Sequence, residues 1–408
     1  MINLVNYLDR YLVAALTESI KHSELHPTDT ELGLLMTGFL VVYLLVAPVF
    51  GALGDTRSRP RLLGVGVAIW SVATAASGLV RSYGALFAAR AVVGIGEAAY
   101  GTISPALLAD SFPRARRGRV FAIFFAAMPV GAALGYIVGG LMDRYFGWRY
   151  AFFVAGVPGL VLAALALRLY DPPRGGQDAA EGGGAIAGQG AAQTLPGRAA
   201  RAAYAALLRN RPYVLTVLGY AAYTFAIGAL AFWTPSFLER ARGIPKAQAT
   251  VQFGAIVVAT GFLGTYAGGW LGDYALRVSK QAYLWVSGLV TLAAAPLTLA
   301  ALAATTPAVY WTAIVAAELC LFASTGPINS AIVNLVAPHM RATAVALSIF
   351  AIHVLGDVPS PSLVGAISDA RSLDQAVLII PVAVFVGGAI WTYAAWRGGR
   401  RPAGEATP

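Results

Sequence analysis

The chain has 408 residues, of which 58% are hydrophobic and only 12% are charged, and its net charge is +10. Soluble globular proteins average about 25% charged residues, so this composition excludes an ordinary soluble domain and indicates an integral membrane protein. The positive charge gathers in particular loops rather than on one face, which argues against a nucleic-acid partner.

Twelve apolar segments follow one another along the chain, each close to the length of about 20 residues that a spanning helix needs. They cover residues 1–20, 32–53, 62–80, 84–108, 119–141, 149–169, 212–237, 250–271, 282–303, 308–335, 343–367 and 374–396. We therefore predict an all-α membrane protein with twelve transmembrane helices in two pseudo-symmetric bundles of six.

One long polar connection interrupts this series and divides the chain. We predict an N-terminal bundle at 1–170, a cytoplasmic linker at 171–211, a C-terminal bundle at 212–396 and a cytoplasmic tail at 397–408. The Gly/Ala/Gln-rich core of the linker is typical of a flexible connection.

Lysine and arginine are shared unevenly between the two sides of the predicted membrane segments. Placing the termini and every second loop on one side puts 19 of these residues there and 8 on the other side. Because positively charged loops remain in the cytoplasm, we predict a multi-pass protein of the cell (inner) membrane with both termini cytoplasmic. The first segment lacks a cleavable signal-peptide pattern, and its start almost at Met1 would fit further residues upstream.

Three short patterns recur in the same order in the two halves. They are Gly51-Ala-Leu-Gly-Asp55 with Gly269-Trp-Leu-Gly-Asp273, Pro113-x-x-Arg116 with Pro338-x-x-Arg341, and Gly139-Gly-Leu-Met-Asp143 with Gly365-Ala-Ile-Ser-Asp369. The spacing between partners is nearly constant, which three chance matches would not produce. Parallel repeats about an axis along the membrane normal are a transporter architecture, with the binding site at the repeat interface near the midplane.

Four charged residues, Asp9, Arg10, Arg90 and Glu97, lie inside apolar segments. An ionised side chain at the bilayer centre costs roughly 2.5 kcal/mol or more, so each needs a partner or a wet cavity. Arg90 and Glu97 share a helix face but lie two turns, roughly 10 Å, apart. We expect Asp9 near Arg90 and Glu97 near Arg10, with Gly94 allowing the backbones to approach. The opposite pairing stays open, because sequence does not determine helix rotation.

A carboxylate beside an arginine at this depth is a candidate proton site. If a conformational change moves the arginine away, the carboxylate takes up a proton, which links protonation to the conformational equilibrium. We assign proton coupling to Asp9 first and to Glu97 second. Arg10 and Arg90 are candidates to bind an anionic headgroup, and Glu318 is a candidate to line the same cavity. The alternative is a static network that orders the first and fourth segments.

A second set of charged residues lies at predicted cytoplasmic helix ends. We predict a conformational latch in which Asp55 engages the eleventh segment or its N-terminal flank when the cytoplasmic side is closed, and releases when that side opens. Arg59 lies in the same loop, and Asp273 occupies the repeated position in the second half. The alternative is a set of solvated turn residues, although the repetition of the aspartate argues against it.

Several of these motifs resemble those of a known family. The stretch from Gly51 to Arg61 resembles the helix 2–3 signature of the major facilitator superfamily, with Ser58 where the family has a glycine. Arg90-x-x-x-Gly94-x-Gly96 resembles its helix 4 motif, and Gly147-Trp148-Arg149 is also typical. Asn6-Tyr7-x-Asp9-Arg10 together with Glu97 is similar to the Spinster family, including its bacterial members.

The resemblance implies alternating access by two rocking bundles, with the first, fourth, seventh and tenth helices lining a cavity. Eukaryotic Spinster members are associated with sphingolipid and lysolipid export, and bacterial members look proton-dependent. We therefore predict a proton-coupled secondary transporter of an amphipathic small molecule, with a lipid-like anion as one candidate.

Two alternatives remain, one for the transported molecule and one for the class of protein. The same fold could carry a hydrophilic solute or a drug, and a membrane-embedded enzyme or receptor is the alternative of another class. No catalytic or metal-binding pattern appears among the four scattered histidines or elsewhere, so we expect no enzyme activity, cofactor or metal. The expected partners are protons, a small-molecule or lipid substrate and membrane lipid, and the expected state is a monomer.

Overall fold

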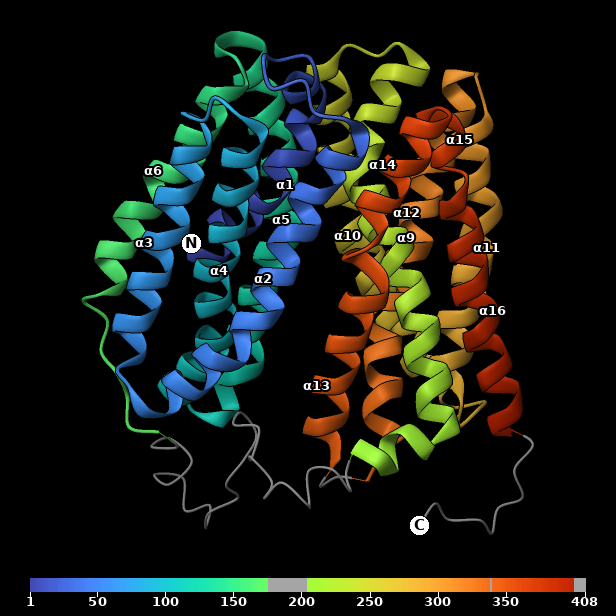
Figure 1. Cartoon of the computed structure of the whole chain (residues 1–408). Coiled ribbons are helices and arrows are strands. Elements are labelled where there is room, and N and C mark those ends of the chain that lie inside the picture. Colours follow the sequence, from blue (N-terminus) through green and yellow to red (C-terminus); the bar gives the residue numbers. More distant parts are fainter. Residues whose placement is uncertain (175–203, 338–339, 400–408) are drawn as a thin grey trace. The chain divides into compact units, whose positions relative to one another are not determined.

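The computed structural model describes residues 1–174, 204–337 and 340–399, and all regular elements within these ranges are helical (Figure 1). The predicted all-α class is therefore confirmed. The core of the predicted linker and the last residues of the predicted tail lie outside the described residues.

The first six helices are α1 (Ile2–Lys21), α2 (Asp29–Thr56), α3 (Arg59–Ser77), α4 (Tyr83–Ser111), α5 (Arg114–Phe146) and α6 (Trp148–Ala166). The later elements are α9 (Arg211–Arg242), α10 (Lys246–Ala275), α11 (Ala282–Ala303), α12 (Pro307–Asn334), α13 (Arg341–Ile352), η2 (His353–Asp357), α14 (Ser360–Ala370), α15 (Leu373–Ala376) and α16 (Ile379–Gly399). Each predicted apolar segment corresponds to one helix or to a run of consecutive helices.

Length and composition allow eleven helical stretches in the described ranges to cross a membrane. The predicted first span, α1, is not among these eleven stretches. Its composition is too polar, because it carries Asp9, Arg10 and Glu18 within twenty residues. This helix is also the one in which Asp9 and Arg10 were predicted to form ion pairs with the fourth segment.

The eleventh predicted segment, 343–367, is interrupted rather than continuous. It is built from α13, the π-helical turn η2 and α14, and the N–H of Val358 donates to the carbonyl of His353 over 3.1 Å. Pro359 and Pro361 follow, and neither has an N–H with which to continue the ladder. The interruption thus has a local cause in the sequence.

The structure divides into two compact units. The first comprises the described residues up to Arg174 together with Phe232–Ala255 and Pro361–Asp369, and the second comprises the other described segments. The first unit therefore contains the last turns of α9, the first turns of α10 and most of α14. The predicted division into bundles at 1–170 and 212–396 stays a prediction.

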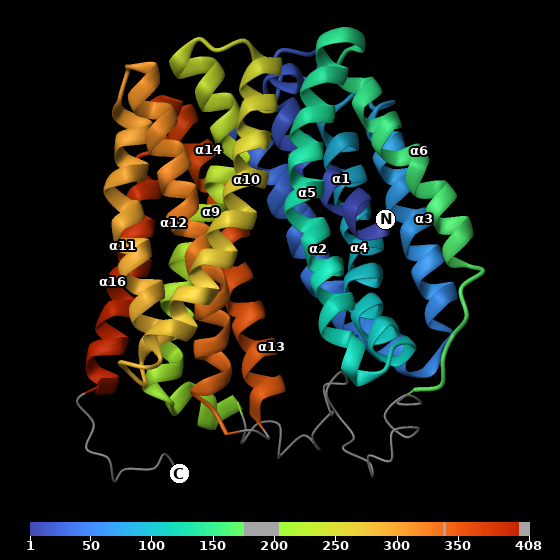
Figure 2. The same cartoon turned by 180° about the vertical axis from the view of Figure 1, so that it is seen from behind.

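Within the first unit, close helix packing depends on glycines. In both views α1 lies beside α5 and α2 beside α4 (Figure 1; Figure 2). A Cβ atom on Gly131 of α5 would lie 2.6 Å from the carbonyl oxygen of Leu4, and one on Gly135 would lie 2.6 Å from that of Leu8. This is the small-residue packing that membrane helices use, and it holds α1 with its charged residues against α5.

Within the second unit, α11 packs against α12 and α16. Buried aromatic side chains satisfy their polar atoms on backbone carbonyls: Trp391 donates to Thr216 over 2.9 Å, and Tyr223 donates to Leu321 over 2.8 Å. The second of these bonds ties α9 to α12 near Glu318.

Candidate functional site

Two ion pairs join α1 to α4 inside the first unit. Arg10 Nη2 lies 2.8 Å from Glu97 Oε2, and Arg90 Nη1 lies 3.2 Å from Asp9 Oδ2. Asp9, Arg90 and Glu97 are each only 1% exposed. These are the two pairings that we expected from the sequence, and they give each of the four charged residues singled out in α1 and α4 a partner of opposite sign.

Aromatic rings surround the guanidinium group of Arg10. Its Cζ atom lies 5.1 Å from the ring centroids of both Tyr7 and Phe39 and 5.6 Å from that of Tyr43. Cations within about 6 Å of an aromatic centroid are attracted by the ring quadrupole. The site therefore presents a cation within an apolar wall, which suits a molecule with an anionic group and a hydrocarbon part.

The site also contains buried polar atoms that lack a partner among the described residues. They are Glu97 Oε1, Arg10 Nε and Asn6 Nδ2. An unsatisfied buried polar group costs about 1–3 kcal/mol, so such atoms call for an explanation. Glu97 uses one carboxylate oxygen for Arg10 and keeps the other free to accept a hydrogen bond or a proton.

Phe39 and Tyr43 belong to α2 and were not predicted as part of the site. A Cβ atom on Gly94 would lie 2.5 Å from the carbonyl oxygen of Phe39. Gly94 therefore lets α4 approach α2, and it brings the two aromatic rings to Arg10. In the sequence, the only signal was two aromatic residues spaced i, i+4 in an apolar helix, which is also the pattern of ordinary packing.

Glu318 lies in the second unit, on α12, and is 7% exposed. Within the part of the chain that the structure describes, its carboxylate forms no ion pair and no hydrogen bond. A carboxylate buried without a counter-ion does not belong to the α1–α4 charge network. Its place in substrate binding stays a prediction.

The predicted latch residues have different environments. Asp55 is exposed and, among the described residues, forms no ion pair, while Asp273 is exposed and accepts a hydrogen bond of 2.8 Å from Tyr283 of α11. Arg59 is 3% exposed. It pairs with Asp110 at the end of α4 over 2.5 Å and with Asp171 after α6 over 2.8 Å. Arg59 therefore joins three segments rather than lying in a solvated turn.

The sequence also matches known proteins along most of its length. Residues 1–361 match the model of the Major Facilitator Superfamily. The chain is 34% identical to protein spinster homolog 3 of Danio rerio, covering 95% of this chain and 81% of that protein. This chain belongs to the Spinster family of the major facilitator superfamily. It is therefore a multi-pass membrane transporter and not an enzyme.

Two further relatives extend the comparison of Spinster sequences. The sphingosine-1-phosphate transporter SPNS2 of Xenopus tropicalis is 33% identical, over 95% of this chain and 78% of that protein. Protein spinster of Drosophila melanogaster is 34% identical over 90% of this chain, which spans 60% of that longer protein.

Solved structures of other proteins share the fold of this chain. A bacterial homolog to the human lysosomal transporter Spinster, in an inward-facing and unoccupied conformation, matches with a TM-score of 0.84 at 21% identity, covering 98% of this chain and 97% of that one. A D-xylose-proton symporter matches with a TM-score of 0.71 at 16% identity, covering 97% and 94% of the two chains. At these identities the likeness establishes the fold alone.

Proposed function

We propose that this protein is a proton-coupled secondary transporter of an amphipathic anion with a single long hydrocarbon chain, such as a sphingoid phosphate or a lysolipid. The observation that carries the proposal is the Arg10–Glu97 pair of this Spinster chain. It consists of a buried carboxylate and a half-buried guanidinium that lies within 6 Å of three aromatic ring centroids. The name of the SPNS2 relatives, sphingosine-1-phosphate transporters, supports the choice of cargo.

The proposed coupling follows from competition for Arg10. A phosphate can accept two parallel hydrogen bonds from a guanidinium, so a substrate headgroup displaces Glu97, which accepts a single hydrogen bond from Arg10. Glu97 then loses its counter-ion inside a low-dielectric site and takes up a proton, because burial disfavours an unpaired charge. Asp9 and Arg90 form a second pair of the same kind, and we assign Asp9 the proton that links transport to the membrane gradient.

The proposal also covers the orientation of the protein in the membrane and its change of conformation. The protein lies in the inner membrane of the cell with both termini in the cytoplasm, and it works as a monomer. Asp55, Arg59 and Asp273 act as a latch on the cytoplasmic side, where Arg59 is already bound to two carboxylates. The two bundles expose the site to each side in turn.

Transport by purified protein in liposomes tests the proposed cargo. We expect flux of sphingosine-1-phosphate without chemical conversion, and no flux of D-xylose or a nucleoside. Arg10→Gln should lower the flux at least about tenfold, since a charged hydrogen bond is lost. The exposed carboxylate variant Glu24→Gln is the matched control and should transport normally. Flux of the sugar or the nucleoside without flux of the lipid would contradict the proposed cargo. Accumulation of a chemically converted product would contradict the proposal that the protein is a transporter.

A further inference from the structure

The repeated Gly-x-x-x-Asp pattern of α5 and α14 has no part in the proposed chemistry. Its two aspartates, Asp143 and Asp369, lie at the end of the first unit where α1 ends and α2 begins, which we call the α1–α2 end. Both aspartates are bound there to the start of another helix.

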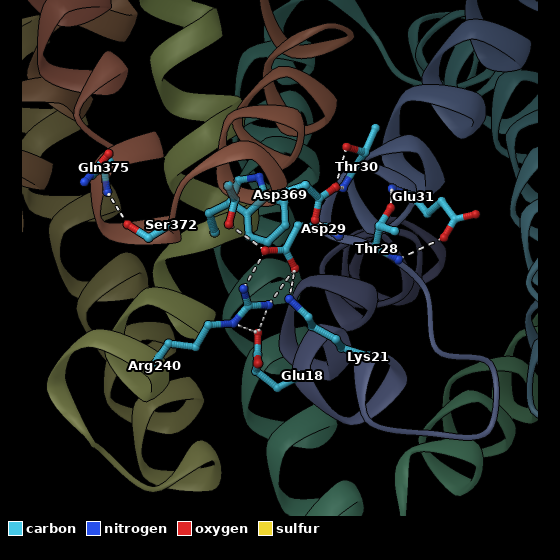
Figure 3. Close-up of polar contacts among 12 residues, drawn as sticks. Glu18, Lys21, Thr28, Asp29, Thr30, Glu31, Arg240, Asp369, Ser372 and Gln375 are labelled. Atoms are coloured by element: carbon cyan, nitrogen blue, oxygen red, sulfur yellow. Dashed lines mark hydrogen bonds and ion pairs between the residues drawn. The ribbon is translucent and has the colours of Figure 1, made fainter.

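Asp369 of α14 binds the first turn of α2. Its Oδ1 accepts from the N–H of Asp29 over 2.8 Å, and its Oδ2 accepts from the N–H and the hydroxyl of Thr30 over 2.8 and 2.6 Å (Figure 3). A helix N-terminus attracts a carboxylate through its free N–H groups and its dipole. The glycine of the pattern makes the approach possible, because a Cβ atom on Gly365 would lie 2.2 Å from the carbonyl oxygen of Asp29.

The side chain of Asp29 extends this contact to two more helices. Arg240 of α9 lies 2.6 Å from Asp29 and 2.6 Å from Glu18 of α1, and Figure 3 shows its guanidinium between the two carboxylates. Lys21 and Ser368 each donate to Asp29 over 2.5 Å. One cluster of charge-assisted bonds thus joins α1, α2, α9 and α14.

Asp143 of α5 makes the corresponding contact with the start of α10. Its Oδ2 lies 3.2 Å from Nζ of Lys246, the first residue of α10, and accepts from the hydroxyl of Ser19 over 2.6 Å. Lys246 also donates to Ser19. A Cβ atom on the neighbouring glycine, Gly140, would collide with Thr250 of α10, so this helix pair also needs a glycine for its approach.

The contacts are built so that they can open. The side chains of Arg240 and Lys246 are 22% and 26% exposed, so water already reaches both cations. Their partners Glu18, Asp29 and Asp143 are only 4%, 3% and 7% exposed, so opening has to bring water to these carboxylates. The start of α2 has a second, local cap: Thr28 accepts from the N–H of Glu31, and Glu31 accepts from the N–H of Thr28. This capping box keeps α2 capped when Asp369 leaves.

We propose that the repeated Gly-x-x-x-Asp pattern forms two equivalent latches, Asp369 on the start of α2 and Asp143 on the start of α10, that hold the α1–α2 end closed and release together in each transport cycle. The proposal rests on the alternating access proposed above. It gives the internal repeat a mechanical role on the side opposite the cytoplasmic latch.

A disulfide reporter tests the two latches. The hydroxyl oxygens of Thr37 in α2 and Ser362 in α14 lie 3.3 Å apart, so Thr37→Cys with Ser362→Cys, in a Cys320→Ser background, should cross-link only while this end is closed. Asp369→Asn and Asp143→Asn should each shift the equilibrium about tenfold toward the open end, the loss expected for one charge-assisted bond. The double variant should shift it about a hundredfold, since independent effects add in free energy.

Asp374→Asn is the matched control, because Asp374 is an exposed carboxylate of α15 that lies beyond the cluster; it should leave the cross-linking rate unchanged. Asp369→Glu and Asp143→Glu keep the charge and should recover part of the closed population, which separates release of the latch from misfolding. Unchanged cross-linking in the double variant would overturn the latches. The cross-linking readout needs no substrate, so a failure of lipid flux alone would refute only the proposed cargo.

Discussion

Arg90 and Asp9 form an ion pair whose two side chains are 2% and 1% exposed. Removing one partner of such a pair leaves a buried charge uncompensated, at a cost of about 3–5 kcal/mol. We predict that Arg90→Ala lowers the thermal stability of the detergent-solubilised protein strongly, and that Arg90→Ala combined with Asp9→Asn recovers part of the loss. Thermal unfolding of the four proteins of this double-mutant cycle measures the coupling, and additive losses would contradict a direct pair.

At the residue scale, the charged pairs were predictable because Asp9 and Arg10 at the middle of one segment offer a partner of each sign to Arg90 and Glu97 of the other. Desolvation then requires that opposite charges meet. The environment of Arg59 was not predictable, because its partners Asp110 and Asp171 lie 51 and 112 residues away in the chain. The aromatic wall of Phe39 and Tyr43 was missed for a similar reason, since contact with Arg10 depends on how α2 and α4 pack.

At the scale of elements, the approach of α4 to α2 depends on Gly94. We predict that Gly94→Val destabilises the protein and abolishes transport, because its side chain would overlap the backbone at Phe39 and move the aromatic rings from Arg10. Gly84→Ala, in the first turn of the same helix, is the control: no heavy atom lies within 4 Å of its new Cβ. The alanine should stabilise the helix by roughly 0.5–1 kcal/mol.

The experiment measures the thermal unfolding and the lipid flux of both glycine variants. Normal flux in Gly94→Val would show that the close contact between α2 and α4 does not position the site.

The elements themselves followed from apolar length, and most predicted ends lie within a few residues of the observed helices. The interruption at His353–Asp357 is the exception, because apolar residues continue through it. Pro359 and Pro361 were visible signals of a break, but the indole of Trp233 in α9 binds the carbonyl of Pro361 over 2.9 Å. This contact with another helix cannot be recognised in one segment alone.

At the scale of the whole molecule, the internal repeats and the twelve apolar segments were enough to predict a transporter fold. The function of the Gly-x-x-x-Asp repeat was not predictable, because its partners are helix starts that the sequence does not connect to it. The family is established by sequence similarity, whereas proton coupling rests on the geometry of four charged side chains.

The measurement that tests this coupling most directly is substrate-driven proton flux in proteoliposomes that contain a pH-sensitive dye, compared between the wild type, Asp9→Asn and Glu97→Gln. We predict that the wild type moves protons together with sphingosine-1-phosphate, that Asp9→Asn loses the dependence of transport on pH, and that Glu97→Gln weakens it. Proton flux and pH dependence that persist unchanged in both variants would contradict the assignment of the coupling to the carboxylates of α1 and α4.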